Sequence, residues 1–359
     1  MVKPVVISML VCILIAPCKV SAQEQKEFTP TLKWSGFTHM WIGYVQRDNL
    51  DVHYGFIPRY VRLKASGKLT PDVQFAIQAS YDKGTPALLD VFLSYEPSPF
   101  FKVRVGQFPV PGIKSAVHSS PLWGTAKMKL NDRPTIAQNW NSNVALSGFR
   151  SGGVMLYGGI TDDKVQYFAM ISMPHAGPNY YWNPSVKSPR YENDENGLAL
   201  FTRLEFRPVK NVETGLSFHT GSGTVGDTIK TNRNSFSVYF VTQYQKLYFM
   251  TEYIAGMNKQ FLNDIKDSEF SYSGFFAETA YKITPKLEPT LRYDYYIPIK
   301  DAFDAIGYKK YSNITVGLNY YVFKNIALMT NYVMRTEDPA EGYSTIHNDL
   351  FYVQLRFKY

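Results

Sequence analysis

The chain has 359 residues, with 38 Lys and Arg against 30 Asp and Glu and a formal net charge of +8. That surplus is mild and spread along the chain, whereas a protein that reads nucleic acid concentrates its cations on one face, so nucleic acid is excluded as a partner. Aromatic residues make up 16% of the chain and include 27 Tyr and 24 Phe. This content is typical of barrels that carry aromatic girdles at the two membrane interfaces.

The start of the chain has the layout of a secretory leader. Lys3 gives the positive start, residues 5–16 form an apolar run, and Val20–Ala22 supplies the small residues of a cleavage site. The apolar run is shorter than the roughly 20 residues that a helix needs to span a bilayer, although a retained anchor helix is the alternative. We predict that residues 1–22 are removed and that residues 23–359 form one extracytoplasmic domain. Both cysteines lie in the leader, so we expect no disulfide in the mature chain.

Apolar and polar residues alternate from residue 32 to the end of the chain, as the two faces of β-strands require. In a barrel that spans a bilayer, each strand turns an apolar face to lipid and a polar face to a wet lumen. The strands of a secreted soluble β-protein would show the same alternation, so the lengths of the connections have to distinguish the two classes. We place strands near residues 32–46, 56–69, 72–82, 87–96, 100–109, 145–159, 164–174, 197–207, 211–221, 233–244, 247–257, 269–283, 286–297, 309–322, 326–336 and 347–359.

The connections between these segments alternate between short and long. Short joints such as 70–72 and 245–246 have the residue types of tight turns, whereas the polar stretches 173–196, 221–232 and 258–268 are longer. Short turns at one end and long loops at the other are the layout of an outer-membrane barrel with both termini in the periplasm. We therefore predict an all-β fold, a transmembrane antiparallel β-barrel of about 16 strands with a long third loop folded inward.

The segment from Pro109 to Asn143 is too long for an ordinary connection and has no clear helical or strand period. We expect it to fold into the barrel and narrow the bore. The predicted pore-lining or anion-binding residues, taken from this segment and from inward strand faces, are Arg62, Lys64, Lys102, Arg104, Lys114, Lys127, Lys129 and Arg133. The predicted inward acids are Asp90, Glu96, Glu205, Glu213, Glu252, Glu278, Glu288 and Asp294.

Cations outnumber these acids on the predicted inward strand faces, because the strands also turn inward Lys68, Arg203, Arg207, Lys282, Arg292, Lys309, Arg335, Arg356 and Lys358. A low-dielectric wall focuses the field of such charges into the bore, so a small excess of positive charge favours anions. For any single residue the alternative is a charge that pairs across the strands and only solvates the wall. The pattern taken together predicts a weak anion preference.

Catalytic and metal-binding patterns are missing from the sequence. The six histidines lack the spacing of metal ligands, and no G-x-S-x-G nucleophile motif occurs. Residues 221–226 match G-x-G-x-x-G, but another predicted strand follows them and not the helix that would receive a phosphate. We predict a protein that is not an enzyme and that needs no cofactor or metal.

Two passages have a distinctive residue order. Residues 59–75 read RYVRLKASGKLTPDVQF, and residues 101–111 read FKVRVGQFPVP and open the long segment. These passages, and the layout of the whole mature chain, resemble the phosphate-selective porin O and P family. The resemblance implies a sixteen-stranded, usually trimeric outer-membrane channel for anions, with its third outer loop in the pore. It also implies that Lys102, Arg104 and the cations of residues 110–143 lie at the constriction.

The sequence thus predicts an outer-membrane porin that forms a water-filled passive diffusion channel, weakly anion-selective, for small hydrophilic solutes. Two alternatives stay open, which are a porin specific for phosphate or another oxyanion and a non-conducting structural or adhesive barrel. The expected partners are small hydrophilic or anionic solutes, phosphate among them, outer-membrane lipid, and further copies of the chain in a homotrimer.

Overall fold

The structure is a computed structural model of the whole chain. It describes residues 28–45, 54–82, 85–118, 129–130, 133–144, 149–173, 198–225, 229–262, 265–298, 308–339, 342 and 348–359. The predicted leader, residues 1–22, lies outside the described residues, so its cleavage stays a prediction.

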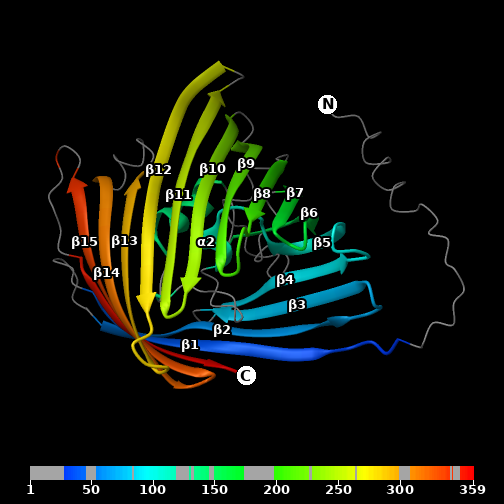
Figure 1. Cartoon of the computed structure of the whole chain (residues 1–359). Helices are drawn as coiled ribbons and strands as arrows, with labels where there is room; N and C mark the ends of the chain where they lie inside the picture. Colours follow the sequence, from blue (N-terminus) through cyan, green and yellow to red (C-terminus); the bar gives the residue numbers. More distant parts are fainter. Residues whose placement is uncertain are drawn as a thin grey trace, which may run out of the picture.

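Sixteen antiparallel strands in the described residues form one closed barrel, in which each strand pairs with its neighbours in sequence (Figure 1). The predicted strand number and fold class are confirmed. The elements are β1 (Lys33–Val45), β2 (Tyr54–Lys68), β3 (Val73–Asp82), β4 (Thr85–Tyr95), β5 (Lys102–Pro109), α2 (Lys114–His118), α3 (Thr135–Asn143), β6 (Arg150–Ile160), β7 (Val165–Met173), β8 (Ala199–Phe206), β9 (Val212–Val225), β10 (Ile229–Tyr244), β11 (Leu247–Leu262), β12 (Ile265–Tyr281), β13 (Leu287–Ile297), β14 (Tyr308–Phe323), β15 (Ile326–Pro339) and β16 (Leu350–Lys358).

The barrel closes between its first and last strands. Phe37 of β1 pairs with Lys358 of β16, and the backbone amide of Gly36 donates a 2.8 Å hydrogen bond to the carbonyl of Tyr359. The Tyr359 ring lies so close to Gly36 that a side chain there would overlap it, which explains the glycine. Closure removes the two sheet edges, so every strand can satisfy its backbone groups within a bilayer.

The two faces of the wall differ as the alternation predicts. On β8, Leu204 is exposed to the outside while its neighbours Arg203 and Glu205 are buried on the inner side. Exposed aromatic rings lie near both ends of the strands, with Tyr44 and Tyr54 at one end and others at the other, such as Tyr244, Tyr281 and Tyr359. An apolar outer band between aromatic rings fits a barrel that sits in a membrane.

Three predicted boundaries are wrong. The long loops expected at 221–232 and 258–268 are mostly strand, because β9 to β12 continue as tall hairpins beyond the rest of the wall (Figure 1). The strand expected from residue 145 starts at Arg150, and the irregular segment before it contains α2 and α3. No helix in the described ranges is long and apolar enough to cross a membrane.

Candidate functional site

The inner face of β8 to β13 carries a row of buried acids. Glu205 on β8, Glu252 on β11, Glu278 on β12, and Glu288 and Asp294 on β13 are each at most 2% exposed. A carboxylate in such surroundings is strongly destabilising unless charges or hydrogen bonds compensate for the lost water. Much of that compensation comes from the β5–β6 connection, whose described parts lie on this inner face.

Lys114, the first residue of α2, contacts three of the wall acids. Its ammonium lies 2.7 Å from Glu205 Oε1 and also pairs with Glu213, while its backbone amide donates a 2.7 Å hydrogen bond to Glu252. The amide of Ser115 donates to the other Glu252 oxygen at 2.8 Å. Burial lowers the pKa of the Lys114 ammonium and Arg203 adds to that effect, whereas the two paired glutamates oppose it. The ammonium does not face the bore as expected, because it holds the connection to the wall.

Lys129 and Thr135 anchor the second part of the connection. The Lys129 amide donates to Glu278 at 2.8 Å, and its ammonium lies 3.0 Å from Glu288. The Thr135 amide, at the start of α3, donates to Asp294 at 2.9 Å. Backbone amides and lysine ammonium groups of the connection therefore compensate the acidic row, together with Arg203, Arg207 and Arg292 of the wall.

An apolar contact holds α3 in place. Trp140 is fully buried, and its indole nitrogen donates a 2.9 Å hydrogen bond to Ser235 of β10. Its ring stacks near Phe149 and meets Phe201 of β8 edge-on. Gly112 lies directly against the indole, where even a methyl group would overlap it.

A basic surface lies on β5, three strands along the wall from Glu205 on β8. Arg104 donates to Ser94 at 2.8 Å and to the hydroxyl of Tyr157 at 3.2 Å, and its guanidinium lies 4.2 Å from the centre of the Phe92 ring. Lys102 lies over the Tyr157 ring at 5.9 Å. Neither cation forms an ion pair with any described carboxylate, so their charges are available to the lumen.

Arg62 and Lys64 continue this surface on β2. Arg62 is buried and holds Asp82 through two nitrogens, with NH2 at 2.6 Å and Nε at 3.1 Å from the same oxygen. Lys64 is half-buried and in register with Gln78 of β3. Asp82 of β3 thus partly compensates the positive charge of the β2 surface.

The other two predicted residues fall elsewhere. Arg133 is half-buried, with its guanidinium 4.0 Å from the centre of the Phe149 ring, next to α3. Lys127 lies outside the described residues. The eight predicted inward acids are all buried or half-buried. The sequence did not predict that all of them except Asp90 and Glu96 contact the connection.

The comparisons with known proteins decide the class. A family model described as phosphate-selective porin O and P matches residues 172–359, which is more than half of the chain. The chain belongs to this family. This porin is therefore an outer-membrane β-barrel channel, and its family and fold are those of a channel and not of an enzyme. No curated protein matches it.

Solved structures share the porin's fold at low sequence identity. The anion-selective porin from Comamonas acidovorans is 14% identical with a TM-score of 0.65, covering 92% of this chain and 100% of that one. The outer membrane channel DcaP of Acinetobacter baumannii is 13% identical with a TM-score of 0.64, covering 92% and 97%. The trimer form of OmpT from Vibrio cholerae is 9% identical with a TM-score of 0.63, covering 92% and 100%.

Sequence reasoning missed two arginines of the porin's inner wall. Arg150 is buried on β6, and its Nε lies 2.6 Å from Asp90. Arg59 belongs by alternation to the lipid face of β2, yet it stacks on the inward ring of Trp41 at 5.1 Å. A β-bulge causes this change, because the register with β1 skips Arg59 between Pro58 and Tyr60. The signal was Pro58, since proline within a strand often marks a bulge.

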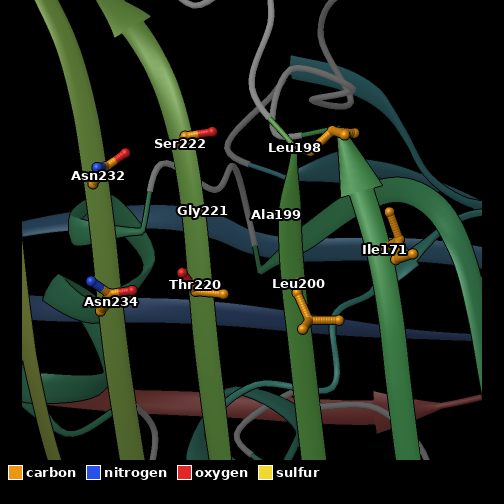
Figure 2. Close-up of a pocket in the computed structure, with 9 residues that line it drawn as sticks. All are labelled: Ile171, Leu198, Ala199, Leu200, Thr220, Gly221, Ser222, Asn232 and Asn234. Atoms are coloured by element: carbon orange, nitrogen blue, oxygen red, sulfur yellow. The ribbon is translucent and has the colours of Figure 1, made fainter. Parts of the chain in front are cut away.

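A groove on the porin contributes nothing to charge selection. It crosses β7 to β10 on the outer surface, where Ile171 and Leu200 are exposed and in register (Figure 2). None of its lining residues is charged; they are Ile171, Leu198, Ala199, Leu200, Thr220, Gly221, Ser222, Asn232 and Asn234. No group of three or more His, Cys, Asp or Glu side chains in the described part of the chain is placed to hold a metal ion.

Proposed function

We propose that this porin is a general diffusion channel for small hydrophilic solutes with a weak preference for anions. The observation that carries the proposal is an asymmetry of charge across the lumen. The acids of β8 to β13 are engaged by the β5–β6 connection, whereas Lys102 and Arg104 on β5 have no described carboxylate partner. The bore that is left between the connection and β5 therefore has a net positive lining, which attracts anions and repels cations.

The path of the connection supports a narrowed bore. Its described parts run along the inner face from β8 to β13, so they reduce the open cross-section of the lumen on that side. We propose that the whole third loop does the same, and that Lys102, Arg104 and Lys64 line the constriction opposite it. Arg133 belongs to the loop side, and we propose that it and Lys127 add positive charge there.

Phosphate specificity is the second candidate, and the description of the family favours it. A specific channel binds its solute strongly enough for that solute to interrupt the flow of other ions, whereas a general channel does not. We propose the general channel, because Arg62 holds Asp82 and Arg150 holds Asp90, which leaves few wall cations together in one place.

Reconstitution of the purified porin in a planar bilayer tests the proposal. We expect conductance steps and, under a KCl gradient, a zero-current potential displaced toward the chloride equilibrium potential. A cation-selective potential would overturn the anion preference, and the absence of conductance steps would instead favour the structural or adhesive barrel. Block of the chloride current by added inorganic phosphate would favour the phosphate-specific channel.

The trimer form of OmpT suggests the assembly. We propose that this porin is a homotrimer in the outer membrane, exported by a leader that is cleaved after Ala22. The mass of the detergent-solubilised complex and the N-terminal residue of the purified protein test these two points. A complex with the mass of a single chain would contradict the trimer, and a purified protein that begins at Met1 would contradict the cleavage.

A further inference from the structure

Five side chains on the inner face of β1 and β2 form a stack in which rings and guanidinium groups alternate. Arg59 lies 5.1 Å from the centre of the Trp41 ring and 5.1 Å from that of the Tyr60 ring. Arg62 lies 4.9 Å from the Tyr60 ring and 5.7 Å from the Phe37 ring. Tyr352 of β16 extends the stack beyond Trp41, with ring centres 5.0 Å apart and planes 13° apart. The stack therefore holds two guanidinium groups against aromatic rings along the lumen wall.

The two arginines of the stack differ in one respect. The guanidinium of Arg62 already has a carboxylate partner, because Asp82 Oδ2 accepts hydrogen bonds from both its Nε and its NH2. Arg59 forms no ion pair with any described carboxylate, and its Nε is a buried donor for which the described residues offer no acceptor. A buried donor without an acceptor is destabilising, so it calls for an explanation.

The bulge shows how Arg59 reaches this position. In a regular strand the residue before the inward-facing Tyr60 would point to lipid, where an arginine is unfavourable, but here Arg59 is the extra residue of the bulge. With it, Arg59 and Tyr60 both lie beside the inner face of β1. The local irregularity in the strand thus converts a lipid-facing position into a lumen-facing cation.

We infer that Arg59 is a carboxylate-binding subsite of the lumen wall, with small organic carboxylates as its ligands. The Arg62–Asp82 pair shows what a guanidinium held in this stack accepts, which is a planar carboxylate that approaches the edge formed by Nε and NH2. Two rings lie 5.1 Å from the Arg59 guanidinium and limit its motion, which reduces the entropy lost when a carboxylate binds. The half-buried side chain turns its edge toward the lumen to receive the ligand and thereby satisfies Nε.

The subsite lies nearer the long connections than the β5 cations do. Arg59 is close to the start of β2, at the end of the barrel opposite the chain termini, whereas Lys64 lies further along the strand. A carboxylate entering from the long-loop end therefore meets Arg59 before it meets Lys102 and Arg104. The subsite adds chemical preference to the simple charge selection proposed above, and it depends on that proposal only in needing an open lumen.

Arg59→Lys is the variant that separates geometry from charge, because lysine keeps the charge but lacks the planar fork. The measured quantity is the concentration of propionate that halves the chloride conductance, compared with ethanesulfonate, which has the same charge and chain length but a tetrahedral head. We expect propionate to act at lower concentration than ethanesulfonate on the wild type. In Arg59→Lys the propionate value should rise about tenfold, as loss of a bidentate charged contact predicts.

Arg62→Lys is the matched control, since Arg62 stacks in the same way but already holds Asp82. In this variant the propionate concentration that halves the conductance should stay within about twofold of the wild type, because only a guanidinium without a carboxylate partner can bind the solute. If Arg59→Lys fails to assemble into a heat-resistant barrel, Arg59→Gln gives the same comparison and should weaken propionate further.

Three results would overturn the inference: a wild type that does not prefer propionate, an Arg59 variant with an unchanged propionate value, or an equal change for both anions. A cation-selective wild type would overturn the proposed function as well. An anion-selective wild type in which Arg59→Lys changes nothing would overturn this inference alone.

Discussion

Lys114 and Glu205 form an ion pair inside the barrel, with Nζ and Oε1 2.7 Å apart and the two residues only 3% and 1% exposed. One partner belongs to the β5–β6 connection and the other to the wall, so the pair fixes the position of the connection. Arg203 and Arg207 also contact Glu205, at 2.9 Å and 2.8 Å. Removing the lysine therefore leaves the glutamate compensated in part.

Lys114→Met tests whether this pair holds the connection. The loss of one partner of a buried ion pair costs about 3 kcal/mol, here at the lower end of the usual range because two arginines remain. We expect a lower temperature for heat denaturation in detergent and a larger or noisier single-channel conductance. Lys246→Met, in an exposed turn between β10 and β11, is the control. Equal behaviour of the two variants would show that Lys114 is not an anchor.

Gly112→Ala tests how α3 packs against the residues that directly follow β5. A methyl group at residue 112 would overlap the indole of Trp140, which has no room to move because it is fully buried. Overpacking of this kind costs about 1–3 kcal/mol. We expect a lower denaturation temperature and a changed tryptophan emission spectrum. Gly55→Ala on β2 meets no atom within 4 Å and should change neither, so a similar effect of both substitutions would contradict the account.

Asp90→Asn tests the sign of the lumen charge from the acidic side. Asp90 is buried on the inner wall and compensates Arg150, with 2.6 Å between Oδ1 and Nε. Asparagine keeps the shape but removes one negative charge, so the zero-current potential should move further toward that of chloride. Asp338→Asn is the control, since Asp338 is exposed and pairs with Lys310 at the end of β15. A shift toward cations in Asp90→Asn would be incompatible with a lumen that selects by net charge.

The sequence was sufficient to predict most of the barrel because the signals are local. Alternation sets the faces of a strand, and turn residues such as Pro71 and Asn325 end it, so all sixteen strands could be placed. The extensions of β9 to β12 were not predicted, because outside the bilayer both faces of a strand are polar. Residues 221–232 and 258–268 then look like loops.

The site was less predictable because its contacts are long-range. Lys114 and Lys129 were assigned to the long segment after β5, but nothing local shows that they meet Glu205 and Glu288. Arg59 was missed because one bulge reverses the alternation, and only Pro58 marks it. The placement of Lys102 and Arg104 at the constriction stays a prediction.

We propose that the β5 cations set the ion preference of the lumen, because the connection and the wall arginines compensate the acidic row. The most direct measurement is the zero-current potential of the double variant Lys102→Glu/Arg104→Glu under a KCl gradient, beside that of the wild type. The account predicts a chloride-selective wild type and a double variant displaced toward the potassium equilibrium potential. Two conducting channels with the same zero-current potential would contradict it.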